Sequence, residues 1–120
     1  MSTAAPVTPA PAAPPAGLAQ PIRIRARVQD GLTEVLVLMP HPMETGLRKD
    51  GTGAFIPAHF ITDMRVSVEG RTVLEARMSI AVSADPLLTF RFRGGQPGQP
   101  ITVSWTDNRR QQRSDTATIT

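Results

Sequence analysis

The chain of 120 residues contains no cysteine and no tyrosine, and it has only four phenylalanines and one tryptophan. The absence of cysteine excludes disulfide bonds, thiol catalysis and every metal site that needs a thiolate. No run of about 18 or more apolar residues occurs, so the sequence predicts no membrane-spanning helix. The net charge is only +3, whereas nucleic-acid-binding proteins combine clustered basic residues with aromatic stacking platforms. We therefore expect a protein that binds neither membrane nor nucleic acid.

The composition divides the chain into two parts. Residues 1–20 interleave proline with alanine. Because proline lacks an amide donor and fixes φ, we expect this segment to be a disordered, flexible arm. It has neither the basic start nor the apolar stretch of a secretory signal peptide, so the sequence predicts no signal peptide of its own. Residues 21–120 are expected to fold as one domain around a single modest core.

Apolar and polar residues alternate with a period of two at the start of this domain. In the segment from Ile22 to Gln29, arginines alternate with apolar residues, which is typical of a half-buried strand. The arginines either protect an edge strand or form a charged docking stripe. The next expected strand, from Thr33 to Met39, is apolar at nearly every position. It is therefore either covered on both faces or exposes Leu36 and Leu38 to a partner.

Five further strands are expected after a long connection. The connection spans residues 40–58, and its prolines and glycines disfavour regular structure. Loops of this length in a compact domain tend to be functional. No later stretch has a helical period, and short strands are expected at 60–69, 72–79, 88–93, 101–106 and 113–120. About seven short strands with regularly spaced turns predict an all-β fold, an immunoglobulin-like antiparallel β-sandwich with Trp105 in its core.

The densest group of functional side chains lies in residues 41–46, which read His-Pro-Met-Glu-Thr-Gly. The chain has one other histidine, His59, and no serine in the setting that a catalytic triad requires. Glu44, Asp50 and Asp63 could supply paired carboxylates, but nothing in their spacing demands it. No phosphate-binding glycine loop is present. The sequence therefore predicts a protein that is not an enzyme, with no catalytic residue and no cofactor.

One alternative is a metal site. Met39, His41 and Met43 are spaced two residues apart, so on an extended segment their side chains would share one side. Thioether and imidazole ligands suit copper. Pro40 and Pro42 interrupt the segment, so the common orientation is not assured.

Another alternative is an interaction surface. A loop rich in proline, methionine and aromatic residues beside an apolar strand would expose an adaptable surface of the kind found at subunit interfaces. The same residues could instead pack on the domain's own core, and a stand-alone structural module would expose no apolar strip. The residues expected to form either a partner interface or a structured loop are Leu36, Leu38, Met39, His41, Pro42, Met43, Glu44, Thr45, Gly46 and Arg48.

Several phrases, in order, give the chain a resemblance to a known family. They are residues 41–46, Arg48-Lys49-Asp50 with Gly53, Ile56-Pro57, Val68-Glu69-Gly70 with Val73, Ala84-Asp85-Pro86-Leu87-Leu88-Thr89-Phe90, Val103-Ser104-Trp105-Thr106-Asp107 and Asp115-Thr116-Ala117-Thr118-Ile119. Over residues 22–120 the chain resembles the SoxZ family, the partner subunits of the SoxYZ carrier in bacterial thiosulfate oxidation.

The resemblance implies a division of labour between two chains. SoxZ-like proteins are immunoglobulin-like sandwiches that form a heterodimer with SoxY, whose tail cysteine carries sulfur intermediates covalently. The family works in the periplasm, and the resemblance implies co-export with a signal-bearing SoxY-like partner. It also implies transient contacts with other Sox enzymes. A Z subunit isolated from its partner is expected to be able to self-associate.

Overall fold

The computed structural model describes residues 20–120. The predicted flexible arm, apart from Gln20, lies outside the described residues. Seven strands make up the described part, with no helix among them. In chain order they are β1 (Arg23–Gln29), β2 (Leu32–Leu38), β3 (Ile61–Val68), β4 (Arg71–Arg77), β5 (Leu87–Arg93), β6 (Pro100–Asp107) and β7 (Gln112–Thr118).

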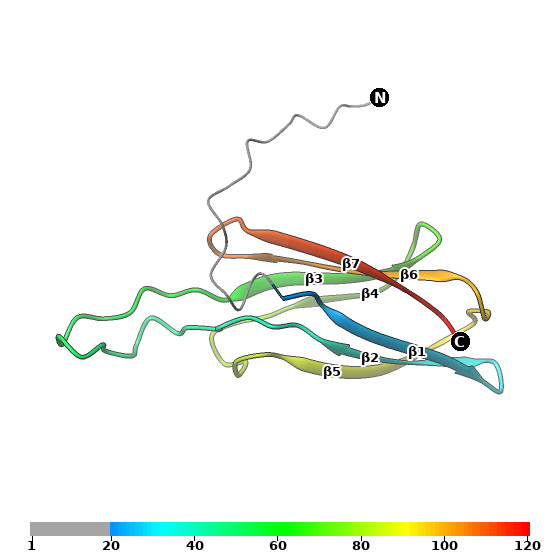
Figure 1. The fold of residues 1–120 in the computed structure, drawn as a ribbon, viewed down its shortest axis with the longest axis horizontal. Helices are drawn as coiled ribbons and strands as arrows, with labels where there is room; N and C mark the ends of the chain where they lie inside the picture. The colour runs from blue at the N-terminus through cyan, green and yellow to red at the C-terminus, as the bar shows by residue number, and fades with distance from the viewer. Residues whose placement is uncertain (1–19) are drawn as a thin grey trace, which may run out of the picture.

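The strands form two antiparallel sheets that pack face to face (Figure 1). One sheet has the order β1-β2-β5 and the other has the order β4-β3-β6-β7. The predicted all-β sandwich is therefore confirmed, and β4 pairs back on β3 as a hairpin. The described residues contain no helix that is long and apolar enough to cross a membrane.

The core lies between the two sheets and follows from the alternation in the sequence. Every second residue of β2 and β6 is buried, as is every second residue of β3 from Met64 on, and Trp105 on β6 is 2% exposed, as predicted. The main buried side chains are Ala26, Val35, Val37, Ile61, Met64, Val66, Val68, Ile101, Val103, Trp105 and Ile119. Burial of this apolar surface is the main favourable contribution to folding.

The sandwich is closed along one side by contacts between β1 and the C-terminal segment. The amide of Val28 donates to the carbonyl of Thr120 at 2.9 Å, and the amide of Thr120 donates to the carbonyl of Ala26 at 2.9 Å. Near the start of β1, the amide of Ile22 donates to a carboxylate oxygen of Asp115, also at 2.9 Å. These bonds satisfy backbone groups that would otherwise form two open sheet edges.

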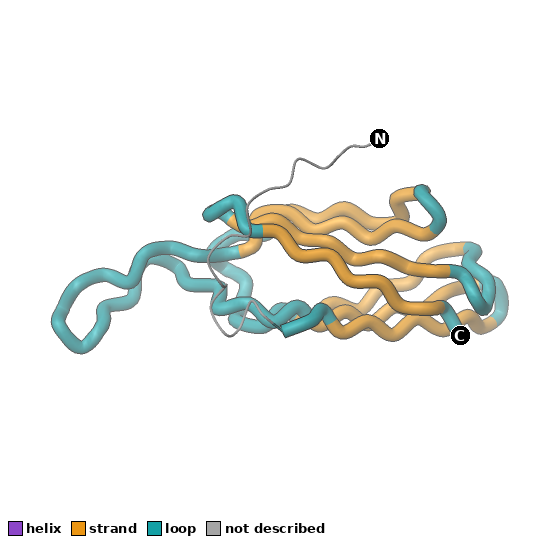
Figure 2. The backbone as a smooth tube through the Cα atoms, turned by 45° about the horizontal axis from the view of Figure 1, so that its top comes forward, coloured by secondary structure: helices purple, strands orange, loops and turns teal. Residues whose placement is uncertain are grey.

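Residues 39–60, called here the projecting loop, extend well beyond the ends of the strands (Figures 1 and 2). Two isolated bridges join its limbs, Glu44 with His59 and Lys49 with Phe55. At its tip the Asp50 carboxylate accepts hydrogen bonds from the amides of Thr52 and Ala54, at 2.8 and 3.2 Å. The prolines, glycines and short polar turn thus give a narrow ribbon with little regular pairing, as the composition predicts.

Candidate functional site

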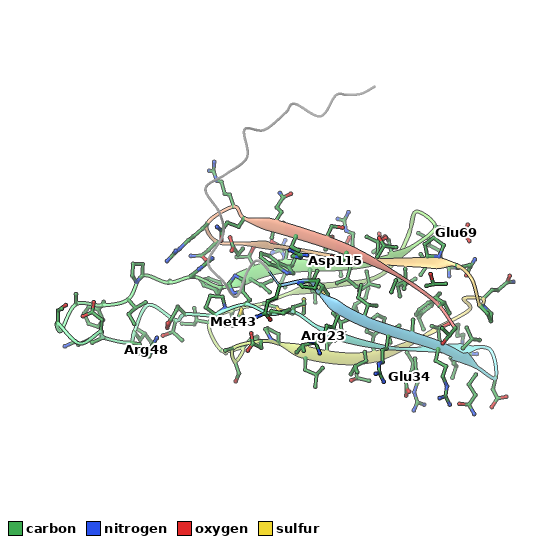
Figure 3. The ribbon with its side chains drawn as sticks, in the orientation of Figure 1. Arg23, Glu34, Met43, Arg48, Glu69 and Asp115 are labelled. Atoms are coloured by element: carbon green, nitrogen blue, oxygen red, sulfur yellow. The ribbon has the colours of Figure 1, made fainter. Side chains whose placement is uncertain are left out.

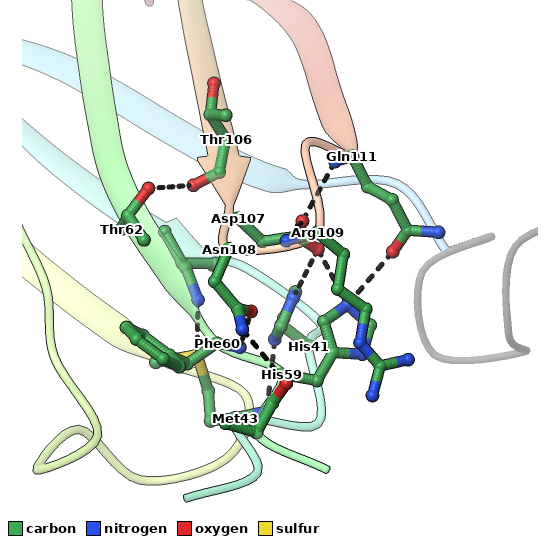
Figure 4. A network of polar contacts seen from close by, with 12 residues as sticks. His41, Met43, His59, Phe60, Thr62, Thr106, Asp107, Asn108, Arg109 and Gln111 are labelled. Atoms are coloured by element: carbon green, nitrogen blue, oxygen red, sulfur yellow. Dashed lines mark hydrogen bonds and ion pairs between the residues drawn. The ribbon is translucent and has the colours of Figure 1, made fainter.

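The structure brings three ionisable side chains together at the base of the projecting loop. His41 and His59 come from the two limbs of the loop, and Asp107 ends β6 beside the start of β3 (Figure 4). All three are buried, with exposed fractions of 0%, 3% and 3%. We call His41, His59 and Asp107 the His–Asp cluster.

The two imidazoles share a single carboxylate oxygen. Asp107 Oδ2 lies 3.1 Å from His41 Nε2 and 2.7 Å from His59 Nε2, and His59 Nε2 also lies 3.0 Å from Gln111 Oε1. The rings meet edge to face with centroids 4.6 Å apart, and the His41 ring meets Trp105 at 5.1 Å in the same manner. The cluster therefore joins both limbs of the loop to β6.

The backbone determines the tautomer of His41. Its Nδ1 accepts a hydrogen bond from the amide of Met43 at 3.0 Å. A ring nitrogen that accepts carries no proton, so the neutral ring carries its proton on Nε2 and donates it to Asp107. Met43 itself has a positive φ of 49°, a left-handed conformation that is uncommon for a residue other than glycine.

Burial sets the protonation state of His41. Desolvation lowers the pKa of His41 below its usual value, and the neighbouring His59 and Arg109 act in the same direction, while the hydrogen bond to Asp107 opposes them. This direction agrees with the neutral tautomer that the Met43 amide requires. His41 is therefore a neutral donor inside the fold.

Asp107 is a buried anion surrounded by donors. Burial raises the pKa of Asp107, but hydrogen bonds from His41, from the amide of Gln111, from His59 and from the amide of Arg109 together lower it below its usual value. The two amides both donate to Oδ1 at 2.9 Å. Because both oxygens accept hydrogen bonds, the cost of burying the charge is offset.

The cluster is also the one group of three metal-type ligands among the described residues whose donor atoms converge, all lying within 4.8 Å of one another. A metal bound at His41 Nε2 would require that nitrogen to lose its proton while Nδ1 gained one. The proton on Nδ1 would then face the amide proton of Met43. The hydrogen bonds therefore fit a structural network that joins the loop to the sandwich better than they fit a metal centre.

The residues of the copper alternative are all turned inward. Met39, His41 and Met43 are 0%, 0% and 5% exposed. The Met43 sulfur accepts a hydrogen bond from the amide of Ile61 at 3.3 Å, and both nitrogens of His41 already have partners. Copper binding by this set would require these hydrogen bonds to break, and nothing in their geometry favours it.

The residues predicted for an interface or a structured loop differ in burial. Met39, His41 and Met43 belong to the core, whereas Pro42 and Arg48 are exposed and Glu44, Thr45 and Gly46 are half-buried. The Glu44 carboxylate accepts two hydrogen bonds from Arg48, at 3.1 and 2.6 Å, and these lower the pKa of Glu44. Leu36 and Leu38 point away from the core on β2, and Leu36 is 38% exposed. An interface in this region stays a prediction.

The sequence analysis did not predict that His59 and Asp107 lie close to His41 in the fold. The positions of the two histidines at opposite ends of one loop were a usable signal, because antiparallel limbs bring such ends together. Asp107 carried no comparable signal. Its place depends on the pairing of β6 with β3, in which Asp107 lies opposite Ile61.

Solved structures with the same fold include three superoxide reductases. One, in its oxidized state, superimposes with a TM-score of 0.58 at 16% identity, covering 83% of this chain and 87% of the other. Superoxide reductase (neelaredoxin) from Archaeoglobus fulgidus gives 0.55 at 22% identity, covering 81% and 86%. A putative superoxide reductase from Thermotoga maritima gives 0.51 at 18% identity, covering 82% and 85%. At these identities the likeness establishes the fold alone.

The sequence itself matches one family model. A comparison with curated protein sequences found no match. The family described as sulphur oxidation protein SoxZ matches residues 22–118, which is almost the whole described domain. The match includes the loop that bears both histidines and the strand that ends in Asp107, and it agrees with the resemblance found in the sequence. The chain therefore belongs to the SoxZ family.

Proposed function

We propose that this chain is the non-catalytic Z subunit of a SoxYZ-type sulfur carrier. In this role it binds a SoxY-like subunit and presents that subunit's tail cysteine, which carries the covalent sulfur intermediates of thiosulfate oxidation, to other Sox enzymes. The observation that carries the proposal is the SoxZ family match over residues 22–118. The absence of cysteine from the chain supports it, because the carried sulfur must then be attached to the partner.

The geometry of the His–Asp cluster supports a structural role for these residues rather than a catalytic one. A general base needs a basic atom within hydrogen-bonding reach of a substrate. His41 uses both ring nitrogens within the fold, and the Nε2 of His59 faces Asp107 and Gln111. With exposed fractions of 3% or less, these rings have the environment of structural side chains. The copper alternative gains no support from this arrangement.

The exposed apolar side chains favour a subunit over a stand-alone module. Five large apolar residues are exposed in the described domain: Leu36, Leu47, Phe55, Ile80 and Leu87. Leu36 and Leu87 lie on one face of the three-stranded sheet, and exposed apolar side chains that share a surface commonly mark interaction sites. We further propose that the complex works in the periplasm and that the Y subunit carries the export signal for both chains.

Co-purification tests the proposal directly. The chain is co-expressed with a tagged SoxY-like subunit that ends in a glycine-rich tail with one cysteine. We expect a one-to-one complex by size exclusion. After incubation of the complex with thiosulfate and the loading cytochrome, intact mass spectrometry is expected to show sulfur adducts on the Y chain and an unchanged mass for this chain.

A Y subunit with the tail cysteine replaced by serine is the control. It should form the same complex and carry no adduct, because the thiol is not part of the folded interface. Failure of this chain to form a complex with the intact Y subunit would overturn the proposal.

A further inference from the structure

The two outer faces of the sandwich differ sharply in composition. Residues that are paired across the three-stranded sheet share a face, and the register aligns Arg23 with Leu38 and Leu87, and Arg25 with Leu36 and Thr89. We call this outer surface the arginine–leucine face. Its members are Arg23, Arg25, Arg27, Gln29, Leu32, Glu34, Leu36, Leu38, Leu87, Thr89, Arg91 and Arg93.

The opposite outer face has no such apolar centre. Its residues across β4, β3, β6 and β7 are Asp63, Arg65, Ser67, Thr72, Glu75, Arg77, Pro100, Thr102, Ser104, Thr106, Gln112, Ser114, Thr116 and Thr118. Its charges are balanced, because Arg65 pairs with Glu75 at 3.2 Å and Arg77 lies 3.9 Å from Asp63. This is an ordinary solvated surface.

Charge on the arginine–leucine face is unbalanced. Five arginines meet one carboxylate, that of Glu34, which pairs with Arg91 at 3.3 Å. Within residues 20–120, no carboxylate forms an ion pair with Arg23, Arg25, Arg27 or Arg93. Figure 3 shows Arg23 and Glu34 on this sheet, at a distance from Arg48 on the projecting loop. A row of arginines left without carboxylates favours a surface of opposite charge.

The apolar part of the face lies at one end, near the projecting loop. Leu87 is 64% exposed and lies directly opposite Leu38 in the pairing of β2 with β5, with Leu36 on the same side of β2. Beside Leu87 a groove of about 300 Å³ is lined by Met78, Val82, Pro86 and Leu88. A second groove of about 600 Å³ runs across Arg25, Arg27, Leu36 and Thr89. Leucines beside grooves and bordered by arginines match the apolar core and polar rim of protein interfaces.

From this arrangement we infer that the Y-type subunit docks on the arginine–leucine face, placing an apolar ridge against Leu36, Leu38 and Leu87 and carboxylates against the β1 arginines. The inference rests on the proposed function, since it takes the Y subunit as the occupant. To the proposed function it adds which surface of this chain the Y subunit contacts and which side chains make the contact. It also requires the Y subunit to carry carboxylates around its apolar ridge.

Other occupants fit this chemistry less well. A second copy of the chain would oppose arginines to arginines, which is unfavourable. Residues 1–19 contain no aspartate or glutamate to meet the arginines. An anionic membrane would match the charge, but the face has no tryptophan or tyrosine to anchor at a lipid interface.

The test measures the affinity of the purified Y subunit for variants of the full chain by isothermal titration calorimetry. The double variant Leu36→Ser/Leu87→Ser is expected to raise Kd by about 30-fold or more, because it removes the buried centre of the interface. The charge reversal Arg23→Glu/Arg25→Glu is expected to raise Kd by about 10-fold and to weaken the dependence of binding on salt.

Two matched sets of variants serve as controls. Arg65→Glu/Arg77→Glu reverses the same charges on the opposite face, and Leu47→Ser/Phe55→Ser removes the exposed apolar side chains of the projecting loop. Both sets are expected to leave Kd within about 3-fold of the wild type, well short of the tenfold change that about 1.4 kcal/mol of binding free energy represents. Circular dichroism and thermal melting confirm that each variant is folded.

Each outcome supports or overturns the inference. Unchanged binding by the folded face variants would overturn it, and a loss confined to the loop variants would move the interface to the projecting loop. A wild-type chain that does not bind the Y subunit would instead overturn the proposed function. Sedimentation with phosphatidylglycerol vesicles, and analytical ultracentrifugation of the chain alone, are expected to show no association. If the wild-type chain sedimented with vesicles or self-associated, and the Leu36→Ser/Leu87→Ser variant did not, the inference would be overturned. The face would then be assigned to a membrane or to a second copy of the chain.

Discussion

The side chains of the His–Asp cluster are buried and hydrogen-bonded, whereas those of the arginine–leucine face are mostly exposed. The cluster contains the residue types most often associated with catalysis or metal binding, yet every one is buried and hydrogen-bonded inside the fold. The face consists mainly of leucine and arginine, which attract little attention in a sequence, yet it leaves apolar area and positive charge exposed. Reactive residue types therefore mark a structural centre here, and common residue types mark the candidate binding surface.

The difference arises from where each group lies on the strands. An imidazole at the end of a buried segment must find partners inside, because an unpaired buried polar group costs about 1–3 kcal/mol. A leucine on the outer side of a strand has no such requirement and can remain exposed until a partner covers it. Substitutions in the cluster should therefore change stability, and substitutions on the face should change binding.

The largest expected effect is that of Asp107→Ala. The substitution removes the carboxylate that accepts from both histidines and from two backbone amides. Those buried donors would be left without their acceptor, so we expect the free energy of unfolding to fall by about 3–5 kcal/mol. Urea denaturation followed by tryptophan fluorescence measures the change, because Trp105 is the single tryptophan.

Asp63→Ala is the matched control for this experiment. Asp63 lies on the outer side of β3 with its side chain 60% exposed, and we expect a change within about 0.5 kcal/mol. Equal losses for the two variants would show that Asp107 does not hold the loop to the sandwich.

The next effect is on the pH dependence of stability. Since the pKa of His41 is lowered in the folded state, the unfolded chain binds a proton more readily below the usual histidine value of 6.5. The stability contribution of His41 is therefore fully present above pH 6.5 and is lost as the pH falls below it, with a slope of at most about 1.4 kcal/mol per pH unit. Asp107, whose pKa is also lowered, adds a loss only below its usual value of 3.8.

Urea midpoints between pH 7.5 and 5 measure this slope, and His41→Gln, which cannot titrate, should flatten it. Nitrogen NMR of the imidazoles offers an independent check, because the neutral ring of His41 is expected to carry its proton on Nε2. A proton on Nδ1 would contradict the assignment and would reopen the question of a metal at Nε2.

A smaller effect is expected at the base of the projecting loop. Gly46 has a φ of 86°, and a Cβ there would lie 3.1 Å from the Cβ of Ala58 on the opposite limb. Gly46→Ala is therefore expected to lose about 1–2 kcal/mol, from backbone strain together with crowding. Gly53 at the loop tip has the same φ of 86° but no neighbour within 4 Å, so Gly53→Ala should lose only the strain contribution, about 1 kcal/mol. Thermal melting compares the two, and equal losses would mean that the limbs separate freely.

The smallest change in stability is expected on the arginine–leucine face. Leu87→Ser removes a side chain that is 64% exposed, so the free energy of unfolding of the chain alone should change by no more than about 0.5 kcal/mol. The same experiment on the complex with the Y subunit should show a clear loss. A large loss in the isolated chain would show that Leu87 belongs to the chain's own core, and the contrast between cluster and face would fail.

Much of the architecture followed from local pattern. The alternation in β1, β5 and β6 predicted strands and their inward residues, because side-chain direction repeats every two residues. Gly31 and Gly70 lie in the turns of the two hairpins, and both have the positive φ that such turns need. The same pattern left two possibilities for β2, and the structure resolves them: Val35 and Val37 are buried while Leu36 is exposed.

The candidate sites were predictable only in part. The stretch from His41 to Gly46 was identified from its residue types, but its side chains were not assigned to the core or the surface. Pro40 and Pro42 interrupt the strand, and Met43 has a left-handed φ of 49°, so the common inward orientation of Met39, His41 and Met43 could not be assumed from a period of two. No local rule covers such a segment.

By itself, the sequence determined an all-β domain after residue 20, the strands within it, the lack of any thiol and the resemblance to the SoxZ family. These follow from composition, from a period of two and from the order of short motifs, which are all local properties. Only the tertiary structure decided that His41 and His59 share Asp107, and that one outer face is polar while the other presents leucines beside arginines. Those facts depend on which strands pair and in what register, because pairing brings together residues that are 48 and 66 positions apart in the chain.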